Sequence, residues 1–204
     1  MRNSVVLLRA SCAACTKQLD VVFVLDGSGS LEDSFEISLN LTKLIVEGLN
    51  FAGGRSRVGV LTFSDQPSVG FYLNRYPDST SVLNAIAFSQ VVGYTNTQAA
   101  LDQLRLSMFT ASNGDRQGVD NIAIVITDGN SNVNADQTIP KAQLAQQSGI
   151  TIIGVGIEDQ DGMNLMEIEG ISSQPPSRYS FAMIDTSDTG VMSTANSILD
   201  LICQ

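Results

Sequence analysis

The chain has 204 residues, a length that favours one domain built around a single hydrophobic core. Hydrophobic residues make up 43% and charged residues 16% of the chain, a balance that excludes a largely disordered protein. Acidic residues number 21 and basic residues 11, so the net charge of −10 argues against nucleic acid as a ligand. The chain has no histidine, which excludes Ser-His-Asp and Cys-His catalysis and histidine-ligated zinc.

The three cysteines lie near the two ends of the chain, at positions 12, 15 and 203. A bridge from Cys203 to either Cys12 or Cys15 would close nearly the whole chain and would indicate an oxidising compartment. The third cysteine would then be unpaired or bonded to another chain. A Cys-x-x-Cys redox pair is the alternative, but such a pair is expected after a strand, and Cys12 and Cys15 precede the first strand-like run.

From residue 19 onward, strand-like and helix-like patterns alternate along the chain. Short continuous apolar runs rich in Val and Ile predict strands buried on both faces, and apolar residues at helical spacing predict the helices between them. The turn-like residues 64–67 permit a hairpin between two neighbouring strands. We predict strands at 19–25, 58–63, 69–73, 122–126, 151–155 and 179–184, and helices at 32–49, 81–88, 97–109, 136–148, 163–168 and 189–202.

This alternation predicts an α/β fold with a doubly wound, mostly parallel central sheet, one short antiparallel edge strand, and helices on both faces. In such sheets, ligands bind beyond the carboxyl ends of the strands, where the strand order reverses. No apolar run approaches the roughly 20 residues that cross a bilayer, so we expect no membrane insertion.

Three segments expected at that edge carry acidic and hydroxyl side chains: residues 26–30, 93–97 and 127–129. Taken singly, the first segment is more typical of a helix cap than of a metal site, and the last is more typical of a turn. Together they offer hard oxygen donors, which suit Mg²⁺. Two carboxylates balance the charge of a divalent ion and add no excess negative charge. A carboxylate from a partner could then also bind to the ion. The candidate ligands are Asp26, Ser28, Ser30, Thr95 and Asp128.

In combination, the three segments resemble the von Willebrand factor type A domain family. Residues 25–30 are similar to the family's Asp-x-Ser-x-Ser motif, Thr95 lies in a Gly-x-Thr-x-Thr segment, and residues 126–129 resemble the family's Thr-Asp-Gly segment. The resemblance extends from about Cys15 to Cys203 and implies a Rossmann-like fold. It implies that residues 15–204 form the type A domain and that residues 1–14 are an N-terminal extension. It also implies a metal-ion-dependent adhesion site, in which the five candidate ligands hold Mg²⁺, with Mn²⁺ or Ca²⁺ as alternatives.

The resemblance further implies a secreted adhesion module of the extracellular matrix, and not an enzyme. Through its metal ion, such a module would bind an acidic group of collagen or another matrix protein. The flanking cysteines are similar to those of matrilins and collagen VI, which implies a Cys15–Cys203 tether and leaves Cys12 unpaired or intermolecular. The alternative is a structural matrix protein that assembles with other copies of itself and associates with mineral or polysaccharide. In that protein, metal-dependent ligand binding would be a secondary function.

Two smaller motifs lie outside this pattern. Asn40, Leu41 and Thr42 match the sequon for N-glycosylation, which predicts modification of Asn40 although it falls within a predicted helix. Residues 113–116 are expected to form a surface turn.

Overall fold

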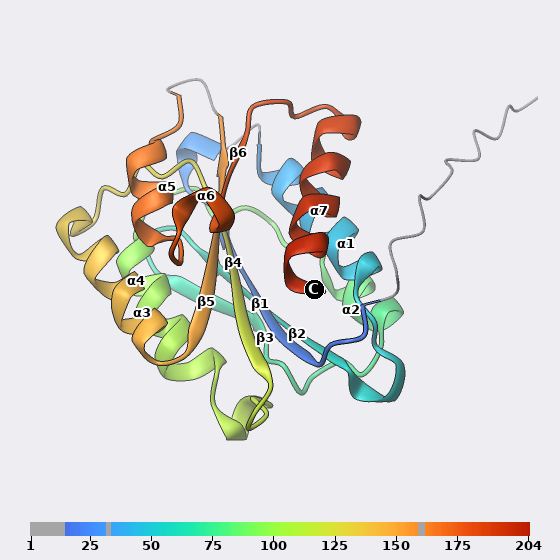
Figure 1. The fold of residues 1–204 in the computed structure, drawn as a ribbon. Helices are drawn as coiled ribbons and strands as arrows, with labels where there is room; N and C mark the ends of the chain where they lie inside the picture. The colour runs from blue at the N-terminus through green and yellow to red at the C-terminus, as the bar shows by residue number, and fades with distance from the viewer. Residues whose placement is uncertain (1–14, 32–33, 159–161) are drawn as a thin grey trace, which may run out of the picture.

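The computed structural model describes residues 15–31, 34–158 and 162–204, and shows a six-stranded sheet between two layers of helices (Figure 1). The strand order is β3-β2-β1-β4-β5-β6. The edge strand β3 runs antiparallel to β2, and the other neighbouring strands described here are parallel. The strands are β1 (Leu19–Asp26), β2 (Ser56–Phe63), β3 (Pro67–Phe71), β4 (Asp120–Thr127), β5 (Ile150–Ile157) and β6 (Ser180–Met183).

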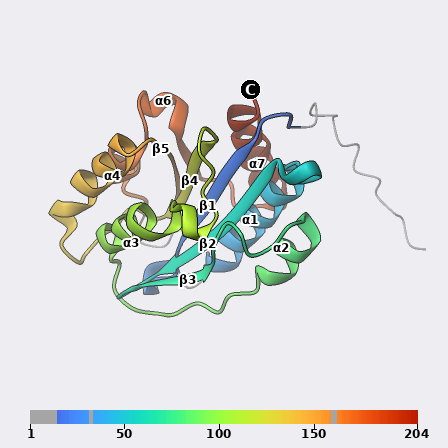
Figure 2. The ribbon, with the colours of Figure 1, turned by 90° about the horizontal axis from the view of Figure 1, so that it is seen from below.

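The helices cover both faces of the sheet, and Figure 2 shows the two layers on opposite sides of the strands. The main helices are α1 (Phe35–Gly48), α2 (Ser79–Ala85), α3 (Thr97–Gln103), α4 (Thr138–Gln147), α5 (Leu165–Ile171), α6 (Pro176–Tyr179) and α7 (Asp188–Ile202). None of the helices among the described residues is both long and apolar enough to cross a membrane.

Strand β1 lies at the centre of the sheet, and all eight of its residues are buried. Its alternate side chains point to opposite faces. Val21 and Phe23 pack into a core shared with α1, α2 and α7, whereas Val22 and Val24 pack into a second core shared with α3 and α4. The predicted doubly wound fold with one antiparallel edge strand is therefore confirmed.

The structure corrects several predicted boundaries. Helix α2 begins before residue 81, because Asp78 caps it by accepting a hydrogen bond from the backbone N of Ser81 at 2.9 Å. The helix predicted over 97–109 ends as α3 at Gln103 and continues as a π-helical turn, Leu104–Met108, in which Phe109 N donates to Leu104 O at 3.4 Å. The short helix α6 was not predicted. Residues 32–33, where the first helix was expected to begin, lie outside the described residues.

A disulfide joins the two ends of the described domain. Cys15 and Cys203 lie 188 residues apart in the sequence, and their Cα atoms are 4.9 Å apart. Cys15 is buried in the core beside α1 and α7, and its carbonyl accepts a hydrogen bond from Asn50 Nδ2 at 3.1 Å. This is the pairing that the family resemblance implies. Cys12 and the expected extension over residues 1–14 lie outside the described residues.

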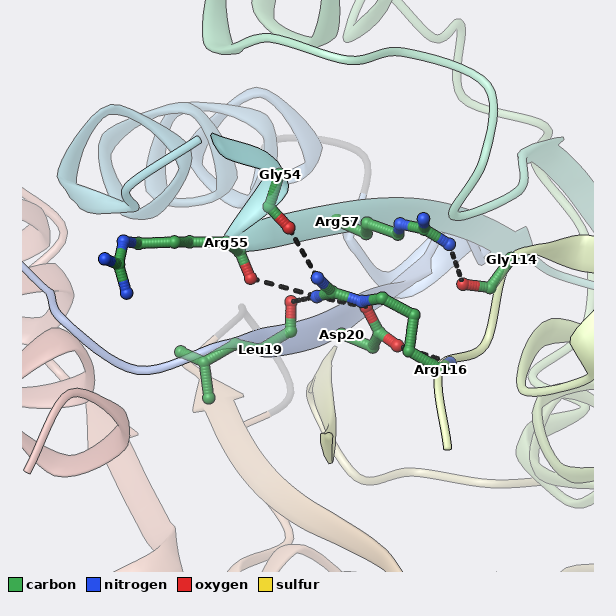
Figure 3. A network of polar contacts seen from close by, with 7 residues as sticks. All are labelled: Leu19, Asp20, Gly54, Arg55, Arg57, Gly114 and Arg116. Atoms are coloured by element: carbon green, nitrogen blue, oxygen red, sulfur yellow. Dashed lines mark hydrogen bonds and ion pairs between the residues drawn. The ribbon is translucent and has the colours of Figure 1, made fainter. Parts of the chain in front are cut away.

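A buried ion pair fastens the sheet at the end where the parallel strands begin (Figure 3). The carboxylate of Asp20, in β1, is fully buried and lies 2.7 Å from Arg116 Nη2. Arg116 also donates from Nε and from its backbone N to the two Asp20 oxygens, each at 2.9 Å. Its guanidinium donates to the carbonyls of Leu19 and Arg55 at 2.9 Å. One arginine therefore ties together the starts of β1, β2 and β4.

Arg116→Met should lower the free energy of unfolding by about 3 kcal/mol, because it leaves the Asp20 carboxylate buried without its counter-charge. Urea denaturation followed by circular dichroism would measure the change. Lys17→Met is the matched control, since its ion pair with Asp120 is exposed and 3.9 Å long. That control should change stability by less than about 0.5 kcal/mol. Equal stabilities of the two variants would contradict the assigned role of Arg116.

Candidate metal centre

The first predicted segment leaves β1 at the carboxyl edge of the sheet. Asp26 is buried, and its Oδ1 accepts a hydrogen bond from Ser28 N at 2.9 Å. This bond turns the chain into the 3₁₀ turn Gly29–Leu31 and brings the hydroxyl oxygens of Ser28 and Ser30 to 3.1 Å from each other. Ser28 is buried and Ser30 is exposed, so one side of the loop opens to solvent.

Asp128 follows β4, the strand beside β1, so both aspartates leave the sheet where its strand order reverses. Thr127 donates to Asp26 Oδ2 at 2.6 Å and accepts from Gly129 N at 3.0 Å. Asp128 Oδ1 accepts from Asn130 N at 2.9 Å. Asp128 Oδ2 is buried and has no hydrogen-bond partner among the described residues. A buried carboxylate oxygen without a partner is unfavourable unless a cation compensates it.

Thr95 is held at the same edge by contacts with the loops that follow β1 and β4. It is buried, its backbone N donates to Asn132 Oδ1 at 2.8 Å, and its carbonyl accepts from Asn132 N at 3.0 Å. Two residues earlier, the Gly93 carbonyl accepts from Gly29 N at 3.1 Å. The structure therefore brings all three predicted segments together at one edge of the sheet.

The oxygen donors at this edge can accommodate a hard divalent cation. Burial raises the pKa of Asp26 to about 6, against the lowering effect of hydrogen bonds from Thr127 and Ser28, and the charge of Asp128 adds to the rise. A bound cation would offset the cost of keeping these carboxylates ionised. Within the described residues, no three His, Cys, Asp or Glu side chains gather as a metal-binding group. Two carboxylates and three hydroxyls are hard oxygen donors of the kind that Mg²⁺ prefers.

The sequence model of one protein family, the von Willebrand factor type A domain, matches residues 20–195. The chain belongs to this family. Among its curated relatives, integrin alpha-X of Mus musculus is 33% identical over 175 residues, which cover 83% of this chain and 15% of the integrin. The collagen alpha-5(VI) chain of Homo sapiens is 37% identical over 158 residues, which cover 76% of this chain and 6% of the collagen chain. This type A domain thus spans a small part of the length of these relatives.

Solved structures of proximal thread matrix protein 1 from the mussel byssus share the fold of this type A domain. One superposes with a TM-score of 0.83 over 93% of this chain and 49% of that chain, at 24% sequence identity. Another structure of the same protein is described as having a zinc-occupied MIDAS motif, where MIDAS stands for metal-ion-dependent adhesion site. At 24% sequence identity, this structural similarity shows that the two proteins share a fold.

A third carboxylate of the type A domain lies close to this edge and was not predicted from the sequence. Glu167, in the first turn of α5, accepts a hydrogen bond from the Ser131 hydroxyl, and the Ser131 and Thr97 hydroxyl oxygens are 2.7 Å apart. Glu167 follows Asp128 by 39 residues and belongs to no motif in the sequence. No sequence signal indicated that its helix turns this side chain toward the loop after β4.

Without divalent cations, we expect the type A domain to lose stability as pH rises from about 5 to 8. Burial raises the pKa of Glu167 to about 7, against the hydrogen bond from Ser131, and the charges of Asp128 and Asp26 add to the rise. Because Asp26 also titrates near pH 6, both carboxyls bind protons more tightly in the folded than in the unfolded chain. Their stabilising contribution is complete below their unfolded pKa values of about 4 and is lost as pH rises through 6 and 7.

Thermal unfolding in EDTA across this pH range would measure the effect. Added Mg²⁺ should raise the unfolding temperature more at the alkaline end, where the two carboxyls are ionised. An unfolding temperature in EDTA that stays constant or rises over this range would contradict the prediction.

Proposed function

We propose that this type A domain is an extracellular adhesion module that binds a divalent cation and, through it, an acidic group of a matrix protein. The proposed ion is Mg²⁺, with Mn²⁺ or Ca²⁺ as alternatives, and the proposed partner is collagen or another matrix protein. The proposed ligands are Asp26, Ser28, Ser30, Thr95 and Asp128.

The observation that carries this proposal is the buried Asp128 Oδ2 atom, which lacks a hydrogen-bond partner among the described residues. Its neighbour Oδ1 is already held by Asn130 N, which fixes the orientation of the carboxylate. Both oxygens of Asp26 accept hydrogen bonds, from Ser28 N and from the Thr127 hydroxyl. Asp26 is therefore a fixed negative charge, and Asp128 offers a free lone pair as a direct ligand.

The balance of charge favours an acidic partner. A bound divalent cation would supply Lewis-acid attraction for one further carboxylate, as hard cations with oxygen ligands do. The two aspartates balance its charge, and the hydroxyls of Ser28, Ser30 and Thr95 add donors without adding charge. Ser30 is the exposed member of the set, so an outside carboxylate would approach from its side.

The relatives and the disulfide support an extracellular setting for the domain. Integrin and collagen chains are among the relatives that exceed 30% identity. A disulfide between Cys15 and Cys203 is stable in oxidising compartments and rare in the cytosol. We propose that the protein is secreted into the matrix, that residues 15–204 form the adhesive domain, and that it has no catalytic role. Asn40 is exposed on α1, and its glycosylation stays a prediction.

Binding to a panel of matrix components, including several collagens, would test the proposal in Mg²⁺ and again in EDTA. Asp26→Ala should be measured beside the wild type. Adhesion through the metal centre predicts a component that binds the wild type in Mg²⁺, fails to bind it in EDTA, and fails to bind the variant. Binding that is indifferent to both EDTA and Asp26→Ala would instead support a structural, self-associating matrix protein with a secondary metal site.

A further inference from the structure

Helix α5 is anchored to the loop that carries Asp128. Asn164 caps this helix: its side-chain Oδ1 accepts a hydrogen bond from Glu167 N at 3.3 Å. The backbone N of the same asparagine donates to the Asp128 carbonyl at 2.9 Å. A Cβ atom at Gly129 would lie 2.7 Å from the Asn164 carbonyl, so the loop and the helix are in close contact there. The first turn of α5 is therefore fixed relative to Asp128.

From this turn, the Glu167 side chain joins two of the segments that form the metal centre. It accepts a hydrogen bond from the Ser131 hydroxyl, and the Ser131 oxygen lies 2.7 Å from the hydroxyl oxygen of Thr97. The Ser131 hydroxyl donates in both contacts, so its single proton is shared between the Thr97 oxygen and the Glu167 carboxylate. Ser131 is three residues after Asp128, and Thr97 is two residues after Thr95. One carboxylate thus holds both ligand-bearing segments.

The carboxylate of Glu167 also lies within electrostatic range of the two candidate aspartate ligands. Burial is the main cause of its raised pKa, but the negative charges of Asp128 and Asp26 contribute to the rise. Glu167 is not itself a candidate ligand, because no three acidic side chains among the described residues gather as a metal-binding group. Glu169, two residues further along α5, is exposed.

We propose that Glu167 is a positioning residue of the metal centre, which aligns the Asp128 and Thr95 segments through Ser131. This inference rests on the proposed cation-binding function. It assigns to Glu167 the acceptor of the hydrogen bond from Ser131, a bond that the charge of the carboxylate strengthens. Glutamine retains the acceptor and removes the charge, whereas alanine removes both.

Isothermal titration of the cation-free protein with MgCl₂ and with MnCl₂ would separate these contributions. Relative to wild type, we expect Glu167→Gln to weaken cation binding about 10-fold and Glu167→Ala about 100-fold, the range found for residues that orient metal ligands. Glu169→Gln is the matched control on the same helix and should change the affinity less than about 2-fold. In EDTA, Glu167→Gln should unfold at the same temperature as the wild type or higher, because a neutral amide is easier to bury than a carboxylate. Weaker cation binding without loss of stability is a result that a merely structural role would not give.

The outcomes distinguish this inference from the function on which it rests. Wild type that binds neither cation would overturn both the proposed function and the role of Glu167. Wild type that binds a cation, with unchanged affinity in both Glu167 variants, would overturn the role of Glu167 alone. Equal losses in Glu167→Gln, Glu167→Ala and Glu169→Gln would also overturn it, because the effect would then follow the net charge of the helix and not the contact with Ser131.

Discussion

Asp128→Asn should lower the affinity of the type A domain for Mg²⁺ by more than about 100-fold, beyond the loss expected for a residue that only orients a ligand. The amide has nearly the shape of the carboxylate, and its oxygen can still accept the hydrogen bond from Asn130 N. What it removes is the charge on the buried oxygen that has no partner among the described residues. Titration calorimetry with MgCl₂ would measure the affinity.

Asp120→Asn is the matched control, because Asp120 lies at the other end of the same strand and its side chain is 65% exposed. It changes the net charge equally and should leave the Mg²⁺ affinity within about 2-fold of the wild type. In EDTA, Asp128→Asn should unfold at the wild-type temperature or above it, since burying a neutral amide is easier than burying a charge. Near-normal Mg²⁺ binding by this variant would remove Asp128 from the proposed ligands.

Replacing both Cys15 and Cys203 by serine should lower the free energy of unfolding by about 5 kcal/mol in the chain-entropy model of disulfides. The expected effect is large because the bridge spans 188 residues, so its loss frees almost the whole unfolded chain. Urea denaturation under oxidising conditions would measure it. Cys12→Ser is the control that leaves the bridge intact and should unfold like the wild type.

The same double variant separates stability from binding. The disulfide lies where β1 begins, whereas the candidate metal ligands follow the carboxyl ends of β1 and β4. Folded molecules of the double variant should therefore bind Mg²⁺ with the wild-type affinity. A stability loss below about 1 kcal/mol would show that the unfolded chain stays compact without the bridge.

The sequence was sufficient to predict the fold and the three loops of the candidate metal centre, because both depend on local patterns. An uninterrupted apolar run such as 19–25 specifies a strand buried on both faces, and the topology then places its carboxyl end beside that of β4. Asp26 and Asp128 follow these two strands directly. Their meeting at one edge therefore follows from strand order alone.

Two polar contacts could not be predicted, because each joins residues distant in the sequence through side-chain geometry. Residues 113–116 were expected to form a surface turn, and Gly114 does adopt the positive φ of 102° that suits a turn. The pattern did not reveal that Arg116 then reaches Asp20, 96 residues away, which is fully buried in β1. Glu167 is similar: an acidic residue in the first turn of a helix is commonplace, and only the packing of α5 brings it to Ser131.

The 4.9 Å separation of Cys15 and Cys203 also has a mechanical meaning. Tension applied to the polypeptide on the outer sides of these two cysteines would pass across the covalent bridge, and the sheet between them would carry little of the load. The strands that position Asp26 and Asp128 would keep their spacing while the chain was stretched. A domain closed in this way would behave as an inextensible link, and the geometry of its candidate metal centre would not depend on the force applied along the chain.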